Sequence, residues 1–503
     1  MKQKLSKIDY SLIIIPLLTI LGLSVIFFIF PNDSKNALLT IRKVLNTYCS
    51  SYYLWFGILF LLSTLFLAFS KLGRIKIGNK NDKPMYSNFK WGMMIFTSTM
   101  SADVIFYSLC EWMMYYNESL IQKKSNPFNW SLTYSLFHWG PIAWSFYIML
   151  AVAFGYMLYV SKNGKQKFSE ACRPILGKYI DRKVGKIIDL IAIFSLVAAT
   201  ATTFSMSLPL LASAVKSLLG AGSLKLWSFL LMLIIVGIYL SVSVLGLKAM
   251  SRFSIIAFSF FGILLLYVFC FSGTASFAIG NGGRALVNLV SNFIPMSLPQ
   301  KIDSFTQNWT VYYWSYWIVW CVATPFFIGS ISKGRTIRQI IFGGYFWGLS
   351  GTFLSFIVLS NFGISRQIQG IVNTTKAVSK GSTYSSTIID LFHTLPNYQM
   401  ALIILCLAMI GLYCTVFDSI TMVISKYSYN DLSIEEDPSK KMRAFWAVVF
   451  SIFPLTLLLT GESFYNIQSV AIIVALPTSI VMIVIVASFY RSIWKNIKNS
   501  KHI

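Results

Sequence analysis

Aromatic rings crowd one apolar stretch of the sequence, WTVYYWSYWIVW at residues 309–320. At about 100° per residue the rings face every side of a helix, which is more than a belt at the membrane surface needs. A second stretch, FHWGPIAWSFY at residues 137–147, adds indoles and a phenol around a Gly-Pro pair that interrupts helical hydrogen bonds. Ring faces attract a trimethylammonium ion, which has no N–H to donate. The predicted cation cage comprises Trp139, Trp144, Tyr147, Tyr316, Trp317 and Trp320, and ordinary packing aromatics are the alternative.

Two carboxylates in a third apolar stretch could supply negative charge. The run FTSTMSADVIFYSLCEW at residues 96–112 places hydroxyl residues just before Asp103. Such runs are typical of unwound helices whose carbonyls and hydroxyls line a cavity. Asp103, Tyr107 and Glu111 share one helical face, and an acid at the centre of a span costs about 2.5–3.5 kcal/mol, which favours a face toward protein or water. The alternative, acids that only hold helices together, suits Glu111 better than Asp103.

Further polar residues are candidates for supporting roles. In LYCTVFDSITMV at residues 412–423, Thr415 could serve an ion, and Asp418 is expected to pair with loop lysines. His138 is interpreted as a packing residue rather than a proton carrier. The seven cysteines lack metal-ligand spacing, and no Gly-x-Ser-x-Gly motif or phosphate-binding glycine loop occurs. We therefore expect no enzyme, no cofactor and no metal. A membrane-embedded enzyme that acts on lipid head groups is the alternative from another class. A channel is disfavoured, because the sequence has no repeated ring of charges that could line a pore.

The composition indicates a polytopic membrane protein. Of 503 residues, 56% are hydrophobic and only 12% are charged. The net charge of +25 comes from Lys and Arg concentrated in short loops, which predicts orientation rather than nucleic-acid binding. The opening MKQKLSKIDY is followed by a long apolar run, which we interpret as an uncleaved first span.

About twelve spans are predicted, in an all-α fold. The basic loops 71–90 and 161–186 are expected to face the cytoplasm, because Lys and Arg are enriched in cytoplasmic loops. Counting spans outward from these loops places both termini on the cytoplasmic side of the cell membrane. The predicted spans lie near residues 10–30, 52–70, 91–117, 131–160, 187–217, 225–247, 253–274, 308–332, 339–362, 398–426, 443–461 and 467–490.

The chain divides into five regions by this count. Five spans precede and five follow a mixed segment at residues 281–304, which suits an amphipathic helix at the interface. Two tandem units of odd span number must be inverted relative to each other, as in many secondary transporters. The regions are 1–86 with two peripheral spans, 87–280 as the first repeat, the interfacial helix 281–304, 305–493 as the second repeat, and a tail at 494–503. A long polar loop is predicted at residues 363–397.

The stretch WTVYYWSYW…FFIGSISKGRTIR resembles the signature helix of the betaine/choline/carnitine transporter family, and FHWGPIAWSFY resembles its fourth helix. The resemblance covers residues 50–490 in span order. It implies the LeuT-like inverted-repeat fold, often trimeric, with a mid-membrane cage around a quaternary ammonium substrate. By position it assigns the cage to the six rings named above, with Tyr316 where many members have Trp.

The resemblance also bears on charge and coupling. The unwound segment of the family is here Ser98 to Asp103, with Met100 kept and Asp103 replacing a glycine, as in choline carriers. The Thr-Ser pair of sodium-coupled members is here Thr415-Val416, which lacks one oxygen ligand. Candidate coupling residues are Asp103, Thr415 and Ser98. Ala257 falls near the position of an arginine that replaces sodium in carnitine exchangers.

The sequence therefore predicts a choline importer without sodium coupling, driven by membrane potential or by protons acting through Asp103. The motif HWGP is closer to the exchanger branch. A glycine betaine, carnitine or γ-butyrobetaine transporter or exchanger is the alternative within the family.

Overall fold

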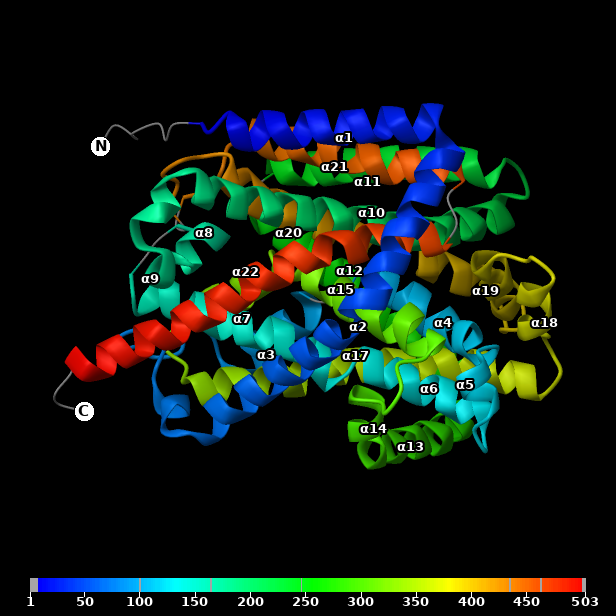
Figure 1. Cartoon of the computed structure of the whole chain (residues 1–503). Helices are drawn as coiled ribbons and strands as arrows, with labels where there is room; N and C mark the ends of the chain where they lie inside the picture. The colour runs from blue at the N-terminus through cyan, green and yellow to red at the C-terminus, as the bar shows by residue number, and fades with distance from the viewer. Residues whose placement is uncertain are drawn as a thin grey trace.

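The computed structural model describes residues 8–98, 101–162, 165–245, 247–433, 436–461 and 464–499. Within these ranges the chain is almost entirely helical, and strand pairing is limited to isolated bridges. Figure 1 shows long helices lying side by side, with α1 (Ser11–Ile29) beginning and α22 (Phe464–Asn499) ending near α8 (Phe168–Ala171) and α9 (Arg173–Leu176). We call this side, which carries the Lys- and Arg-rich loops, the basic side. The opposite side carries α18 (Thr374–Ser379) and α19 (Tyr384–Phe392).

The predicted number of spans agrees with the structure, and most predicted spans coincide with its long apolar helices. In the described part of the chain, ten helices are long and apolar enough to cross a membrane, or up to twelve when each of two bent pairs counts as one span. The unbent spans are α1, α2 (Pro31–Phe69), α6 (Pro127–His138) with α7 (Pro141–Tyr159), α10 (Lys183–Leu219), α11 (Leu224–Leu245), α12 (Leu247–Phe271), α17 (Ile337–Ile368), α20 (Tyr398–Tyr427), α21 (Lys440–Thr460) and α22.

Both bent pairs break where the sequence opposes a continuous helix. α3 (Asn88–Ser98) and α4 (Ala102–Tyr116) meet at 65° across the hydroxyl-rich run before Asp103. A short π-helical turn, η3 (Thr306–Thr310), leads into α15 (Val311–Trp320), which meets α16 (Thr324–Ser330) at 52°. Pro325 in the first turn of α16 has no N–H to continue the helix. Pro141 has the same effect between α6 and α7.

Two helices occupy the region of the segment predicted to be interfacial, and the first begins before that segment. α13 runs Ala275–Ser291 and α14 runs Phe293–Ser297, against a predicted segment of 281–304. Asparagine amides fix α13 to the core, because Asn129 donates to Asn281 Oδ1 at 2.8 Å and Asn281 donates to Asn361 Oδ1 at 2.7 Å. The other face of α13 leaves Val287 and Val290 exposed. The interfacial position of this helix stays a prediction.

Two polar segments are more helical than hydropathy alone indicates. The loop predicted at residues 363–397 contains α18 and α19, and α17 extends into it as far as Ile368. α2 begins at Pro31, well before the span predicted from residue 52. Its polar first half is stabilised by Arg42, whose guanidinium donates to the carbonyls of Tyr465 at 2.9 Å and Asn308 at 3.1 Å.

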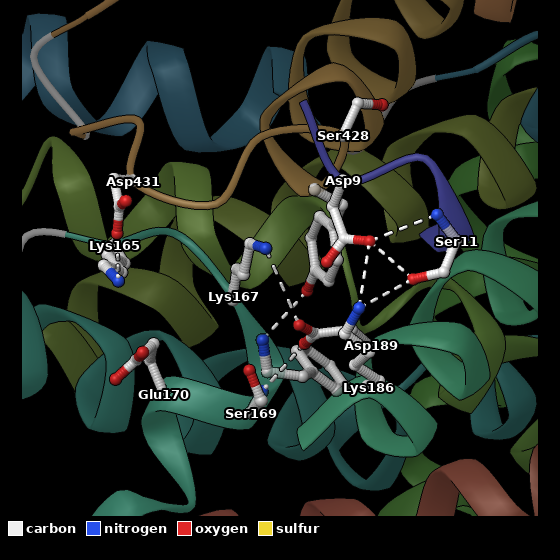
Figure 2. Close-up of polar contacts among 12 residues, drawn as sticks. Asp9, Ser11, Lys165, Lys167, Ser169, Glu170, Lys186, Asp189, Ser428 and Asp431 are labelled. Carbon is white, nitrogen blue, oxygen red and sulfur yellow. Dashed lines mark hydrogen bonds and ion pairs between the residues drawn. The ribbon is translucent and has the colours of Figure 1, made fainter. Parts of the chain in front are cut away.

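On the basic side, polar contacts tie the N-terminal segment to α10 and α20 (Figure 2). Lys186 donates to Asp9 Oδ1 at 3.2 Å, and the Asp9 amide donates to the Ser428 carbonyl at 2.8 Å. Burial alone raises the pKa of Asp9, but hydrogen bonds from Ser11 and Lys186 outweigh it and lower the pKa below its usual value. Lys167 reaches Asp189 at 3.8 Å in the same cluster.

The segment SKGRTIR, residues 332–338, binds the loop that follows α2. Gly334 donates to the Ile77 carbonyl at 2.7 Å, and Ile77 donates to the Arg335 carbonyl at 2.8 Å. Gly334 has a φ of +82°, and a Cβ there would lie 2.2 Å from the Lys83 carbonyl oxygen. This position therefore requires glycine for both backbone conformation and space.

Candidate substrate site

A cavity of about 1120 Å³ leads from the middle of the helix bundle to the basic side. Its deep end is formed by the α3–α4 break, α7 and α15, and its mouth lies among the loops next to α3, α7 and α20. Deep lining residues include Ser101, Asp103, Trp139, Tyr147, Tyr316 and Trp317, whereas Lys90, Gln166, Lys426 and Asp437 lie at the mouth. The molecule is thus open toward one side.

Five of the six predicted cage rings line this cavity: Trp139, Tyr147, Tyr316, Trp317 and Trp320. Trp317 is the central ring, with its centroid 5.6 Å from that of Trp139 and 4.8 Å from that of Tyr147. Rings from α7 and α15, far apart in sequence, therefore meet inside the protein rather than facing lipid.

Trp144 differs from the other five because it does not line the cavity. It is fully buried behind the first layer, with ring centroids 5.7 Å from Trp317 and 5.9 Å from Tyr147. Trp144 thus backs the cage and has no free face toward a substrate. Met100, predicted beside the rings, lies outside the described residues, as does the side chain of Ser98.

Asp103 lies in the first turn of α4, at the deep end of the cavity. Its Oδ1 accepts the Val104 amide at 3.1 Å, and its Oδ2 accepts a hydrogen bond from the Tyr316 hydroxyl. Thr203 of α10 lies 3.4 Å from the same Oδ2 and 2.6 Å from the Tyr316 hydroxyl. Among the described residues, no Lys, Arg or His forms an ion pair with Asp103.

Glu111 lies two turns further along α4 and does not reach the cavity. Its Oε2 accepts the Trp139 indole N–H at 2.8 Å and the Tyr313 hydroxyl at 2.5 Å. It therefore connects one cage ring to the helix that carries three others. His138 likewise bridges helices, pairing with Tyr115 at 2.7 Å and with Thr310 at 3.0 Å.

Side chains beyond the cage seal the opposite side. The hydroxyls of Tyr107 and Tyr312 lie 2.7 Å apart, and Tyr107 also donates to the Met206 sulfur at 2.7 Å. All three residues are almost completely buried. Spacing in the sequence could place Tyr107 on the Asp103 face. The hydroxyl-rich run at residues 195–209 suits either close helix packing or an ion site, but the sequence does not single out Thr203 or Met206 within it.

The candidate coupling residue Thr415 lines the cavity on α20, one turn from Asp418. Its hydroxyl donates to the Leu412 carbonyl at 2.7 Å. Asp418 pairs with Arg443 of α21, which corrects the expectation of a loop lysine. In the part of the chain that the structure describes, no group of three or more His, Cys, Asp or Glu residues could hold a metal ion.

The charged residues of the cavity wall contrast with those of the whole chain. The chain carries 42 Lys and Arg against 17 Asp and Glu. The wall instead carries Asp103, Asp418 and Asp437 against Lys90 and Lys426. Asp103 alone lies among the rings, so the deep end of this basic protein's cavity is acidic.

Comparison with known proteins identifies the class. Residues 11–498 match the family model described as BCCT, betaine/carnitine/choline family transporter. A glycine betaine transporter of Bacillus subtilis is 28% identical over 488 residues, covering 94% of this chain and 92% of the relative. A carnitine transporter of Acinetobacter baumannii is 26% identical, covering 86% and 79%. An osmo-dependent choline transporter of Acinetobacter baylyi is 25% identical, covering 98% and 72%. The three relatives are thus named for three different substrates.

Proposed function

Because the chain belongs to the betaine/carnitine/choline family of transporters, we propose that it imports choline by alternating access. The family makes it a multi-pass membrane transporter of a quaternary ammonium compound rather than an enzyme. We further propose that the basic side faces the cytoplasm, so that both termini lie there and the cavity is open inward. We also propose that three copies of the chain assemble into a trimer, as the family resemblance implies.

The observation that carries the choice of choline is the position of Asp103. Its carboxylate lies at the cage, and the described residues that donate hydrogen bonds to it are neutral, namely the Tyr316 hydroxyl, the Val104 amide and the Thr203 hydroxyl. The start of α4 also presents the positive end of a helix dipole to this carboxylate. These groups offset part of the cost of burying a negative charge that pairs with no Lys, Arg or His among the described residues, and a cationic substrate would supply the missing partner.

Choline suits this arrangement better than its zwitterionic relatives. Its trimethylammonium head can rest on the faces of Trp139, Tyr147 and Trp317, each worth roughly 0.5–2 kcal/mol once desolvated. Because choline has no carboxylate, Asp103 supplies the counter-charge. Glycine betaine and carnitine carry their own carboxylate, which the Asp103 carboxylate would repel at close range.

Membrane potential suffices as a driving force in this proposal. A monovalent cation entering a negative interior gains about 2.3 kcal/mol per 100 mV. Thr415 offers one hydroxyl oxygen beside Val416, where the family resemblance implies a second hydroxyl in sodium-coupled members. A hard cation prefers about six oxygen ligands, so the loss of this oxygen supports uptake without sodium.

Competition for uptake tests the proposal. Purified protein in proteoliposomes should take up labelled choline, and excess unlabelled choline should inhibit this uptake more strongly than equal concentrations of glycine betaine or carnitine. Uptake of betaine or carnitine that choline fails to inhibit would instead assign the chain to the zwitterion carriers. The same result would overturn the role given to Asp103.

A further inference from the structure

One face of α17 packs against the cage from behind. Gly348, Thr352 and Phe356 follow each other at i, i+4 and i+8, and all three are buried. None of them lines the cavity, so none touches a bound substrate. Each contacts one of the two indoles that flank the break between α6 and α7.

Gly348 contacts Trp144. A Cβ added at Gly348 would lie 2.4–2.5 Å from Cε3, Cζ3 and Cη2 of the Trp144 ring. Real side chains essentially never approach this closely, so the ring would have to move. Trp144 in turn packs on Trp317 and Tyr147, and these two rings line the cavity.

Packing alone keeps the Trp144 ring in place. Its indole Nε1 is buried and has no hydrogen-bond partner among the described residues. A hydrogen bond from Nε1 would fix the rotation of the ring, but none is made within the described ranges. The six-membered ring instead occupies the space that a side chain at position 348 would fill. The position of Trp144 is therefore sensitive to this one glycine.

Thr352 and Phe356 contact Trp139. The Thr352 hydroxyl donates to the Trp139 carbonyl at 3.1 Å, a carbonyl that the break between α6 and α7 frees from helical bonding. The Phe356 ring centroid lies 5.4 Å from that of Trp139. One face of α17 thus determines the position of both indoles, each by a different contact.

We propose that the Gly348-Thr352-Phe356 face of α17 is a positioning layer for the substrate cage, in which Gly348 acts through Trp144 and Thr352 acts through the Trp139 backbone. This inference rests on the proposed binding of a trimethylammonium head by the cage. A cation over a ring loses attraction steeply when the ring tilts, so a residue that only orients a ring changes affinity without touching the ligand.

A double-mutant cycle tests Gly348. Binding of radiolabelled choline to the purified full chain would be measured for Gly348→Ala, Trp144→Phe and the double variant. Gly348→Ala should weaken binding about five- to thirtyfold, the range expected for one displaced ring. Phenylalanine lacks the six-membered ring of the indole that would meet the new Cβ. In the Trp144→Phe background, Gly348→Ala should therefore lower choline affinity by less than about twofold, which is the error expected for independent mutations. Losses that multiply in the double variant would overturn the inference.

Two matched controls separate positioning from general damage. Gly237 in α11 and Gly262 in α12 have open space where a Cβ would go, so Gly237→Ala and Gly262→Ala should bind as the unmodified chain does. If Gly348→Ala does not fold, Thr352→Val decides, because it removes the donor without adding volume. We expect Thr352→Val to weaken choline binding about two- to fivefold, because one neutral hydrogen bond contributes roughly 0.5–1.5 kcal/mol. Unchanged affinity would refute the positioning layer.

A last variant distinguishes this inference from the proposed function. Trp317→Leu removes a cavity-lining ring and should weaken choline binding about three- to thirtyfold if the cage holds the substrate. Choline affinity that Trp317→Leu leaves unchanged would defeat the cage itself. Affinity lowered by Trp317→Leu but unchanged in Gly348→Ala would defeat only the positioning layer.

Discussion

Asp103 is a buried acid that accepts hydrogen bonds from neutral donors and pairs with no Lys, Arg or His among the described residues. Its oxygens accept hydrogen bonds from the Val104 amide and the Tyr316 hydroxyl, and it begins α4. A carboxylate at the start of a helix is stabilised by the helix dipole. The hydrogen bonds and the dipole offset part of the cost of burying this charge, and in our proposal a cationic substrate offsets the rest.

Replacing the charge of Asp103 should change substrate preference rather than only activity. Asp103→Asn keeps the size of the side chain and removes the negative charge. We expect choline affinity to fall at least about tenfold, or ~1.4 kcal/mol, while glycine betaine affinity changes little or improves. Competition binding on purified protein measures both affinities. An unchanged ratio of the two would show that Asp103 is not the counter-charge.

Removing a cavity ring should cost more than removing an equally buried ring elsewhere. Trp317 lines the cavity, whereas Trp112 is fully buried against α17 near Gly363 and lines no part of it. Trp317→Leu should weaken trimethylammonium binding about three- to thirtyfold beyond Trp112→Leu. Equal losses in labelled choline binding, with both variants folded, would contradict the cage.

At the residue scale, the sequence could identify ring types and one acid but could not order them in depth. The spacing of Trp139, Trp144 and Tyr147 is compatible with one lining, yet the structure places Trp144 in a second layer. Thr203 lies on α10, 100 residues beyond Asp103 in the sequence. Contacts between distant helices leave no local pattern, so only the packed structure reveals this hydroxyl.

At the scale of elements, two of the breaks in the helices could be predicted. Pro141 and the hydroxyl run before Asp103 each mark a place where helical hydrogen bonding is weakened. The break at Pro325 was not predicted, because hydropathy assigns residues 308–332 to one span. The start of α13 and the polar half of α2 were less predictable, because their stability depends on asparagine and arginine contacts with other helices. Hydropathy does not register such contacts.

The loop docked on residues 332–338 provides a stability test at the scale of elements. Gly334→Ala places a Cβ against the Lys83 carbonyl and strains a positive φ, which costs about 1–3 kcal/mol before the clash is counted. Gly381 also has a positive φ, of +95°, but open space around it, so Gly381→Ala isolates the backbone cost. Thermal unfolding in detergent should show a clearly lower Tm for Gly334→Ala than for Gly381→Ala. Matching Tm values would mean that the docked loop adds no stability.

At the scale of the whole molecule, the cavity opens toward one side only. Its mouth lies among the basic loops, and the tyrosine layer of Tyr107 and Tyr312 closes the other end. Alternating access requires a second state in which this layer separates and the cavity closes on the basic side. The inverted relation of the two five-helix units stays a prediction, supported by a bent first helix in each unit.

Accessibility to thiol reagents tests this one-sided opening. Ser419 is exposed and lines the cavity, whereas Ser360 is fully buried between α17 and α4. Ser419→Cys should react with a membrane-impermeant maleimide in inside-out vesicles, and Ser360→Cys should remain unlabelled above the level of the native cysteines. Labelling of Ser419→Cys only in right-side-out vesicles would reverse the assigned orientation.

The central claim is that the cage and Asp103 together carry a cation, and one flux measurement tests it most directly. Labelled choline uptake into sodium-free proteoliposomes would be followed under an imposed inside-negative potential, for the unmodified chain and for Asp103→Asn. We predict potential-driven uptake by the unmodified chain and at least about tenfold less by Asp103→Asn (~1.4 kcal/mol per tenfold change). Choline uptake that requires sodium, or that Asp103→Asn leaves intact, would contradict this account.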